Sequence, residues 1–432
     1  MPGSNSPERS DGALPAQVDI AIIGSGLTGL CLALFLARQQ TPWSILLLEP
    51  SAGRSGHERE TALEPSFAQT NFHHRQIALA ESSRRLFVEL GLWSEIEAHT
   101  AAITDIHVSD RGHLGHSRLI AAEQGLDAYG YVISAAKLAD LLSTALEKLT
   151  SVRRVASTEG GPGQQTINMR SAGRGMIIEL GESAVCAQLA ALANGEAPDE
   201  AQRLGIQFER KSYDRIALSA ELSLQEPHRG IAYERFTSEG PVALLPLRDR
   251  DALPRAGLVW TLSSERAEQL FTMEDELFLD QLQQSFGDRA GPITGVSHRA
   301  LVPLSKVIAT EQVRRHLVLM GSAAHSLHPV AGQGFNLTLR DIAALCEVLA
   351  DAKANGSAPG DLAALQRYEQ GRAVDQTQVV GFSDVLPGLF ASTNPLLTAG
   401  RNLGLLGLEL APGLRGAVAR FGAGLMARGA KQ

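Results

Sequence analysis

Residues 24–29 read GSGLTG, a GxGxxG motif whose spaced glycines are Gly24, Gly26 and Gly29. An apolar, β-branched run at 18–23 precedes the motif, and an apolar helical pattern follows it. The second glycine lets the backbone approach a pyrophosphate, and the third lets the helix pack closely on the strand. The helix N-terminus also offers unpaired N–H groups and partial positive charge to phosphates. The motif therefore predicts a binding site for a dinucleotide.

A second apolar run, residues 44–48, ends at Glu49, which follows Gly24 by 25 positions. A carboxylate at the end of this strand can accept hydrogen bonds from the ribose of an adenosine. Strand, turn, helix, second strand and terminal Glu together favour a nucleotide site over a ligand-free glycine turn. They leave open whether the ligand is FAD or NAD(P).

A second glycine-rich stretch, residues 317–336, reads LVLMGSAAHSLHPVAGQGFN. It predicts a strand, a turn of small residues, a loop with Pro329 and Gly332, and a helix that begins near Gly334. Glycines let a backbone lie against a flat ring system, and the positive end of the helix would stabilise the negative charge of a reduced flavin. A nicotinamide enzyme has no need of this second site, so the stretch favours FAD.

Metal binding is not expected. His325 and His328 stand at i and i+3, but no Cys, Asp or Glu lies between positions 313 and 340. The three cysteines are far apart in the sequence, which argues against a disulfide framework and fits a reducing, cytosolic compartment.

The elements that must position these motifs follow from hydrophobic periodicity. Residues 18–23, 27–38 and 44–48 predict a β-α-β unit of about thirty residues. Residues 75–90 are amphipathic and predict a helix that ends at Gly91. Between about 205 and 300, strand-like runs follow one another without helices, which is typical of an antiparallel sheet.

The fold class that we expect is α/β. A Rossmann-like dinucleotide-binding domain would be discontinuous, at 17–200 and 300–355, with a mostly antiparallel substrate domain inserted at 201–299. A C-terminal helical region would occupy 356–432, and residues 1–16 would be a disordered lead-in.

Composition limits the possible functions. The 432 residues contain 39 Lys and Arg against 47 Asp and Glu, so the net charge is −8. This acidic balance, with 5% aromatic residues, argues against nucleic acid as a partner. Residues 20–37 carry no charge, but three glycines in their first ten residues favour a strand, turn and helix over a membrane span.

With these motifs, the chain resembles the FAD-dependent aromatic hydroxylases of the p-hydroxybenzoate-hydroxylase fold, and within them the ubiquinone-biosynthesis hydroxylases. The resemblance covers about 19–428. The 24–29 turn and the 317–341 loop and helix are typical of the whole superfamily. Three further stretches favour the ubiquinone branch: ITDIHVSDRGHLG at 103–115, YERFTSEGPVALLP at 233–246 and GRNLGLLGLEL at 400–410.

The resemblance implies a role for each matching residue. The first glycine turn would hold the FAD pyrophosphate, Glu49 the adenosine ribose, and Arg75 would lie along the FAD. The second stretch would line the isoalloxazine, and Ser322 could hydrogen-bond a ribityl hydroxyl. The cofactor-binding residues expected are Gly24, Gly26, Leu27, Thr28, Gly29, Glu49, Arg75, Ser322, Pro329, Gly332, Gly334, Phe335 and Asn336.

Three positions depart from the family pattern by losing a carboxylate near FAD. They are His73, Asn194 and Ser322, where relatives carry Asp. These departures leave open a second hypothesis, in which the protein is a degenerate flavoprotein that serves as a non-catalytic member of a lipid-biosynthesis assembly. A flavin reductase or dehydrogenase acting on a prenyl lipid would use the same two motifs.

The activity that the resemblance implies is hydroxylation of the aromatic ring of a polyprenylated methoxyphenol. NAD(P)H would reduce the FAD, and O2 would react through a flavin C4a-hydroperoxide. The resemblance implies no separate NAD(P)H-binding domain. Other ubiquinone-biosynthesis proteins are possible partners, and we name no catalytic residue or base for the phenol from the sequence.

The C-terminal stretch 400–432 is basic and rich in leucine, with five Lys or Arg against one Glu. One interpretation is peripheral contact with an anionic membrane, where a prenylated substrate resides, so that a cytoplasmic protein would lie at the inner membrane. The other is a helix pair packed on the cofactor domain.

Overall fold

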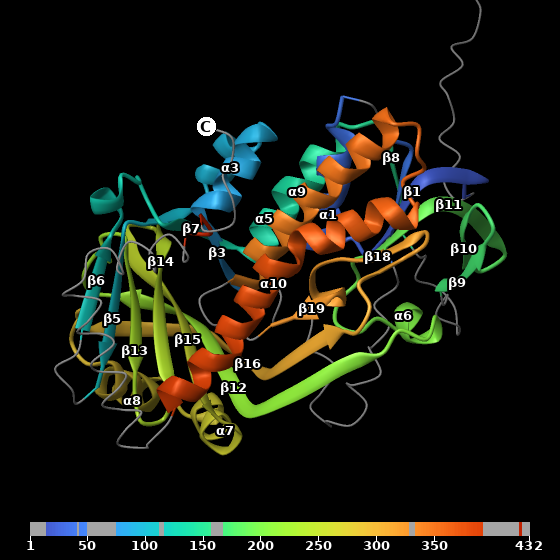
Figure 1. Cartoon of the computed structure of the whole chain (residues 1–432). Coiled ribbons are helices and arrows are strands. Elements are labelled where there is room, and N and C mark those ends of the chain that lie inside the picture. Colours follow the sequence, from blue (N-terminus) through green and yellow to red (C-terminus); the bar gives the residue numbers. More distant parts are fainter. Residues whose placement is uncertain are drawn as a thin grey trace, which may run out of the picture.

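The computed structural model describes residues 14–40, 43–49, 75–111, 116–156, 167–327, 333–391 and 423–425. Three β-sheets and the helices packed on them make up this part of the chain, as Figure 1 shows. The predicted lead-in 1–16 lies almost wholly outside the described residues, as do 392–422 and 426–432.

The first sheet is built around β1 (Gln17–Ile23), which pairs in parallel with β2 (Ile45–Glu49) and β11 (Ser183–Leu192). Successive side chains of β1 point to opposite faces, so Ile20 and Ile22 enter one hydrophobic core while Ala21 and Ile23 enter another. A parallel strand buried on both faces reads as an unbroken apolar run, as this one does. The other strands of this sheet are β8 (Val152–Ala156), β9 (Ile167–Ala172), β10 (Gly175–Leu180), β17 (Val313–Arg314) and β18 (Leu317–Leu319).

Helices α1 (Leu27–Ala37), α5 (Ala135–Glu147), α9 (Gln333–Ala354) and α10 (Leu362–Ala391) share the larger core on one side of this sheet (Figure 1). The α1 side chains are buried nearly all round, because the helix lies between the sheet, α5 and α9. The predicted β-α-β unit and the helix after the second glycine stretch are confirmed, with ends shifted by one residue.

The predicted helix at 75–90 is wrong in its first part. Residues Gln76–Ala80 form strand β3, and helix α3 begins only at Glu81 and ends at Glu89. Ile77 and Leu79 alternate with less buried neighbours at a period of two and pair with β7 (Gly130–Ser134). A short run of apolar residues can fit both the period of 3.6 of a helix and the period of two of a strand. The sequence pattern therefore did not show where the strand ends and the helix begins. Gly91 ends the helical segment as predicted, with a φ of +65°.

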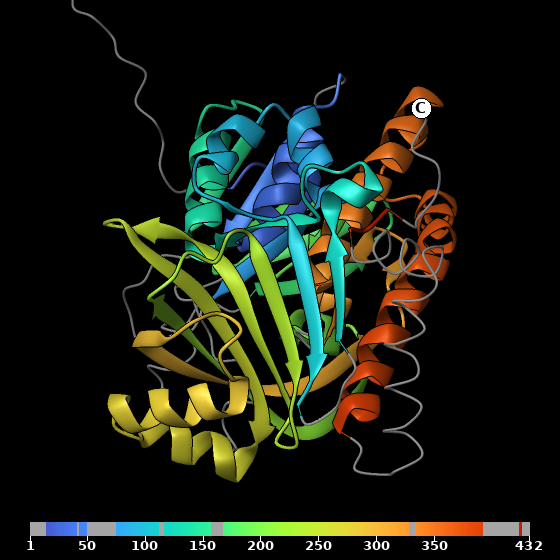
Figure 2. The ribbon, with the colours of Figure 1, turned by 90° about the vertical axis from the view of Figure 1, so that its left-hand side faces the viewer.

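The second sheet has eight strands in the order β19-β16-β12-β15-β14-β13-β5-β6 and is almost entirely antiparallel (Figure 2). The exception is β13, which pairs in parallel with β5. The sheet is thus wider than residues 201–299, since β5 and β6 come from far earlier in the chain. Its strands are β5 (Asp105–Asp110), β6 (His116–Ile120), β12 (Phe208–Leu224), β13 (Ile231–Phe236), β14 (Pro241–Arg250), β15 (Leu253–Ser263), β16 (Ile293–Ala309) and β19 (His325–Ser326).

One face of this second sheet packs on helices α7 (Ser264–Thr272) and α8 (Asp275–Phe286), around the buried Trp260. The other face lies against the third sheet, which has the order β3-β7-β4. The remaining short elements are α4 (Trp93–Glu97), β4 (Ala101–Ile103), η1 (Ala121–Gln124), α6 (Asp199–Arg203) and η2 (Gly321–Ala323).

Helix α10 bridges the first two sheets. Near its end, the Asp384 carboxylate accepts hydrogen bonds from Lys211 Nζ (2.6 Å) and Tyr213 Oη (2.7 Å) of β12 and from Lys306 Nζ (2.8 Å) of β16. Among the described residues, no helix has the length and apolar character needed to cross a membrane.

Candidate functional site

The carboxyl ends of four parallel strands meet at one edge of the first sheet. Ile23 of β1 pairs with Leu48 of β2 and with Leu192 of β11, and Leu192 pairs with Leu319 of β18. The residues that follow these strands must therefore lie side by side. This register brings the two glycine-rich stretches to a single edge, although they are 288 to 312 residues apart in the sequence. Open sheets of this kind bind ligands at that edge.

The first turn needs two of its glycines for backbone packing. Gly24 has a φ of +113°, and a Cβ there would lie 2.6 Å from the carbonyl oxygen of Ala193. A Cβ on Gly29 would lie 1.8 Å from the carbonyl oxygen of Gly24. Strand and helix can therefore approach this closely only without side chains at these positions.

Gly26 differs from these two glycines. It is exposed, and a Cβ built on it meets no atom within 4 Å. It is also the N-cap of α1, where no side chain accepts a hydrogen bond and no acidic residue lies in the first turn. The helix start thus keeps its partial positive charge uncompensated, with open space in front of it, which fits a phosphate. Leu27 contributes only backbone here, since its side chain is buried.

Glu49 ends β2 at the same edge, and its side chain is 52% exposed. Among the described residues, the guanidinium of Arg154 lies 4.0 Å from the Glu49 carboxylate. A half-exposed carboxylate with one weak partner retains oxygens that can accept hydrogen bonds from ribose hydroxyls.

The second glycine stretch touches the first at Gly321. Its φ is +60°, and a Cβ there would lie 2.5 Å from Thr28 Oγ1 on α1. The turn η2 thus packs directly on the first turn of α1, and its middle residue, Ser322, is exposed at the shared edge. The structure therefore brings Gly24, Gly26, Leu27, Thr28, Gly29, Glu49 and Ser322 together.

Helix α9 begins beside them and carries Gly334, Phe335 and Asn336. A Cβ on Gly334 would meet open space, and Phe335 packs against the larger core. The Asn336 side chain is buried: its Oδ1 accepts hydrogen bonds from Ala80 N (2.8 Å) and Ser83 Oγ (2.7 Å), and its Nδ2 donates to Ala78 O (2.9 Å). Asn336 therefore holds α9 to the β3–α3 junction, a role that the sequence did not indicate.

Arg75 lies immediately before β3, and its carbonyl oxygen accepts a hydrogen bond from the Ala135 N–H. Pro329 and Gly332, together with the variant position His73, lie outside the described residues. Asn194, the second variant position, donates from Nδ2 to Glu200 (2.9 Å), while its buried Oδ1 has no hydrogen-bond partner in the described part of the chain.

A buried ionic network supports the loop between β18 and α9. His325 Nε2 lies 2.9 Å from Asp341 Oδ2, and Asp341 also accepts hydrogen bonds from Arg372 Nε (2.5 Å) and Gln376 Nε2 (3.1 Å). His325 thus serves as an anchor for the loop. Sequence reasoning missed this network because Asp341 and its partners lie on β19 and on two different helices, 16 to 35 residues apart.

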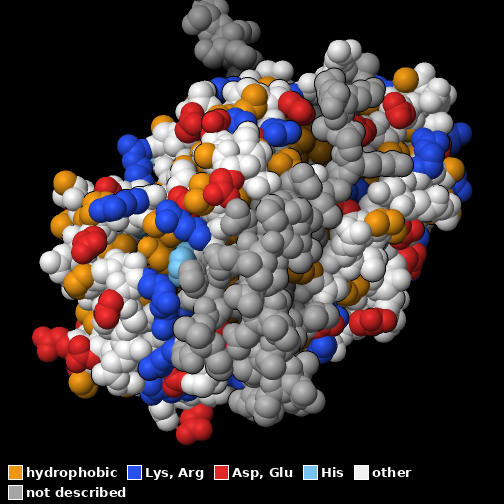
Figure 3. All heavy atoms as spheres, turned by 60° about the vertical axis from the view of Figure 1, so that its left-hand side comes forward, with side chains coloured by type: hydrophobic (Ala, Val, Ile, Leu, Met, Phe, Trp, Pro, Cys, Tyr) orange, Lys and Arg blue, Asp and Glu red, His pale blue; other side chains and the backbone are white. Residues whose placement is uncertain are grey.

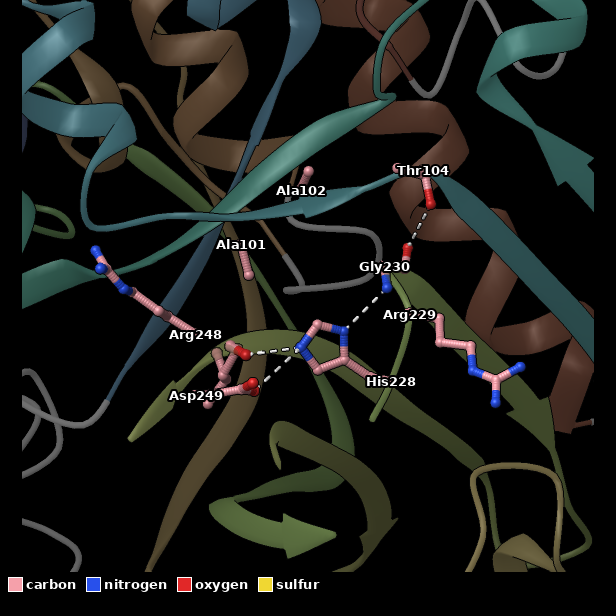
Figure 4. A pocket seen from close by; sticks show the side chains of 9 residues that line it. Ala101, Ala102, Thr104, His228, Arg229, Gly230, Arg248 and Asp249 are labelled. Atoms are coloured by element: carbon pink, nitrogen blue, oxygen red, sulfur yellow. Dashed lines mark hydrogen bonds and ion pairs between the residues drawn. The ribbon is translucent and has the colours of Figure 1, made fainter. Parts of the chain in front are cut away.

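An open cavity of about 360 Å³ lies elsewhere, between β4, the loop before β13 and the end of β14. Figure 4 shows His228 at its centre, bonded to the Gly230 N–H (3.0 Å) and to Leu247 O (2.8 Å). Arg229 and Arg248 point away from each other and from the histidine (Figure 4). Both imidazole nitrogens are engaged, so we assign this cavity no chemistry.

The comparisons with known proteins agree with this geometry. The family model "FAD binding domain" matches residues 17–383. Ubiquinone hydroxylase UbiL of Rhodospirillum rubrum is 31% identical over 400 residues, covering 92% of this chain and 87% of that protein. The 3-demethoxyubiquinol 3-hydroxylase of Escherichia coli is 30% identical over 407 residues, covering 94% and 98%.

A solved structure with the same fold is p-nitrophenol 4-monooxygenase PnpA from Pseudomonas putida, at a TM-score of 0.72 and 15% identity, covering 96% of this chain and all of that one. The fold is thus that of the FAD-dependent monooxygenases. Given the family match and the two relatives, the chain belongs to the FAD-binding family that contains the hydroxylases of ubiquinone biosynthesis.

Proposed function

We propose that the protein hydroxylates the aromatic ring of a polyprenylated methoxyphenol in ubiquinone biosynthesis, with FAD as cofactor and NAD(P)H and O2 as co-substrates. The observation that carries the proposal is the contact of Gly321 with Thr28, which joins two glycine-rich turns at one sheet edge. One turn suits a pyrophosphate and the other a flat ring, so a single FAD could occupy both.

In this proposal, the α1 start and Gly26 hold the FAD pyrophosphate, and Glu49 holds the adenosine ribose. Ser322 hydrogen-bonds the ribityl chain, and Arg75 lies along the FAD. Pro329, Gly332, Gly334, Phe335 and Asn336 line the isoalloxazine, Asn336 by fixing the start of α9. When bound, FAD would take electrons from NAD(P)H and transfer one oxygen atom of O2 to the ring. The protein's own task is to hold the phenol against the flavin and to exclude water.

The substrate class rests on the relatives and on the second sheet. The relatives named above act in ubiquinone chemistry, where substrates are prenylated phenols. The face of the second sheet opposite α7 and α8 lies against β3, the strand that begins next to Arg75. A substrate ring held between this face and the flavin, with its tail along the sheet, fits that arrangement.

We also propose peripheral contact with an anionic membrane through 400–432, which would give access to a prenylated lipid. These residues lie outside the described part of the chain. Figure 3 shows Lys and Arg side chains gathered in a column on one face of the molecule, so that positive charge is concentrated locally although the net charge is −8. Anionic lipid attracts such clusters.

The test is turnover by the purified holoenzyme with a short-chain prenylated methoxyphenol. We expect the substrate to accelerate NADPH oxidation and O2 uptake, and mass spectrometry to find a product with one added oxygen atom. Flavin reduction and reoxidation without a hydroxylated ring would contradict the proposal and favour a reductase. Protein that gains no flavin spectrum with added FAD would instead favour a degenerate member, as the changes at His73, Asn194 and Ser322 suggest.

A further inference from the structure

Glu234 is a carboxylate in the middle of the second sheet for which neither the sequence motifs nor the relatives assign a role. It lies on β13, where Tyr233 and Arg235 point to one face of the sheet and Glu234 to the other. Tyr233 faces Phe286 of α8, with ring centroids 5.7 Å apart. Glu234 therefore points away from α7 and α8, toward the side of the sheet that meets the cofactor-binding half of the molecule.

The strand register defines what surrounds Glu234 on that face. Across the sheet, it stands in one row with Val108 of β5, Ala243 of β14, Val259 of β15 and Ser219 of β12. These side chains are small and all of them stay partly accessible, whereas Leu244, Leu258 and Leu218 on the opposite face are buried in the α7–α8 core. The row therefore forms a floor that is less closely covered than the opposite face.

The neighbouring row shows what this floor faces. Ala232 and Leu119 pack in a core with Val132 of β7. Gln76, the residue after Arg75, donates from Nε2 to Glu221 (2.9 Å). The third sheet thus covers the row that contains Ala232. The row that contains Glu234 is the next one along β13, on the same face of the sheet, and lies beside β3, which begins after Arg75.

Ser117 of β6 supplies a second observation. It pairs with Val108, so its side chain is on the same face as Glu234. Its Oγ is buried, the residue being 2% exposed, and it has no hydrogen-bond partner among the residues that the structure describes. A buried hydroxyl without a partner is costly, and a polar ligand on the floor would satisfy it.

The electrostatic state of Glu234 suits proton transfer. Burial raises the pKa of its carboxyl to about 7, and no charged neighbour contributes to the shift. Other charged groups of the described strands on this face are Glu221, which is paired with Arg255, the buried Asp110, and Arg215, which donates to the Glu239 carbonyl. From α10, Asp384 is bonded to Lys211 and Lys306. A general base works best when its pKa is near the working pH.

We propose that Glu234 is the general base that accepts the proton of the substrate phenol, which deepens the proposed function and rests on it. The phenolic O–H bond breaks, the proton joins a Glu234 carboxylate oxygen, and the electron pair left on the phenolic oxygen enriches the ring. Ser117 Oγ donates a hydrogen bond to a second polar group of the substrate.

The test compares Glu234→Gln with the wild type as FAD-loaded protein. The probe is 2-allyl-6-methoxyphenol, bound anaerobically so that no turnover occurs, and its ionisation is followed by near-ultraviolet difference absorbance from pH 6 to 10. We expect wild type to bind the probe as phenolate well below the pKa of the free phenol. Glu234→Gln should bind it as neutral phenol, with kcat lowered about 10²-fold or more and KM little changed.

Two further variants make the comparison specific. Glu209→Gln makes the same chemical change at an exposed position of β12 and should leave both readouts unchanged. Glu234→Asp keeps the carboxylate and should recover part of the phenolate signal. Equal flavin content in all variants excludes misfolding as the cause of any loss.

The outcomes separate this inference from the proposed function. If wild type hydroxylates the ring, and Glu234→Gln ionises the bound probe and turns over at the wild-type rate, the role of Glu234 is wrong and the function stands. If wild type binds the probe but hydroxylates no prenylated methoxyphenol, the proposed function itself fails.

Discussion

The Cβ that Gly321 lacks would lie 2.5 Å from Oγ1 of Thr28, although the two residues are 293 positions apart. This contact locks the turn after β18 onto the first turn of α1. It fixes the spacing between the two stretches that we propose to hold the ends of one FAD molecule.

We expect Gly321→Ala to lower the free energy of unfolding by about 1–3 kcal/mol, because the residue has a φ of +60° and the new methyl group meets Thr28. Urea denaturation followed by circular dichroism measures the change. In a Thr28→Ala background, the loss of unfolding free energy caused by Gly321→Ala should shrink to the cost of the unfavourable backbone conformation alone. If Gly321→Ala lowers the free energy of unfolding equally in both backgrounds, the side chain of Thr28 does not limit the space at Gly321.

Substitutions at two glycines of the first turn should have different effects, one on FAD binding and the other on folding. Gly26→Val should leave the fold intact, because its side chain would enter open space, but it should abolish FAD retention by blocking the approach of the pyrophosphate. Gly29→Ala should impair folding itself, because its methyl group would overlap the Gly24 carbonyl. Flavin absorbance and thermal unfolding of each variant give the comparison. Wild-type flavin content in Gly26→Val would mean that the site is misplaced.

Glu234 should make stability depend on pH. Its folded-state pKa, about 7, is above the unfolded value of 4.5, so the folded state holds the proton more tightly and stability falls as pH rises from 4.5 through 7. Glu234→Gln removes this loss and should be more stable than wild type at pH 8, by about 1–3 kcal/mol, and nearly equal at pH 4.5. Thermal melts across this range measure the difference. A stability difference between Glu234→Gln and wild type that does not change with pH would contradict the raised pKa of Glu234.

Asp384 should stabilise the folded protein with the opposite dependence on pH. Hydrogen bonds from Lys211, Lys306 and Tyr213 hold the pKa of its carboxyl well below the usual range. The contribution is therefore complete above the unfolded pKa, near 4, and disappears as the pH falls further. Asp384→Asn should cost about 1 kcal/mol at neutral pH, while the difference from wild type narrows toward pH 2. Urea denaturation at several pH values tests this.

Membrane contact should be electrostatic and should involve 400–432. We expect full-length protein to co-sediment with liposomes that contain anionic lipid, and raised salt to weaken binding. Replacing Arg401, Arg415 and Arg420 with Glu should reduce binding several-fold without altering flavin content. Binding that is insensitive to both salt and these charges would favour a helix pair packed on the protein.

Local sequence patterns were sufficient for the β1–α1–β2 unit of the first sheet, but they did not show which strands complete the second sheet. The β1–α1–β2 unit is contiguous, and a buried parallel strand, a glycine turn and a buried helix each leave a clear pattern. The pairing of β5 with β13 joins residues more than 120 positions apart, and no local pattern encodes such a partner. The helix predicted at 75–90 fails for a related reason, because β3 exists only through its pairing with β7.

The candidate site divides in the same way. Gly24, Gly26, Gly29 and Glu49 are recognisable because a dinucleotide imposes its spacing on consecutive residues. Asn336, Asp341 and Glu234 have no such spacing. Their surroundings come from α3, α10 and the strands of two sheets, so burial and partners become visible only once the chain is folded.

The parallel pairing of β13 with β5 has a consequence for protein engineering. A chimera that exchanges only 201–299 with a relative would join a foreign β13 to the resident β5. The new interface would run along Ala232 and Glu234, which pair directly with Ile106 and Val108. Grafts intended to change substrate preference should therefore transplant 105–120 together with the later strands, so that the recombined halves inherit a matched edge.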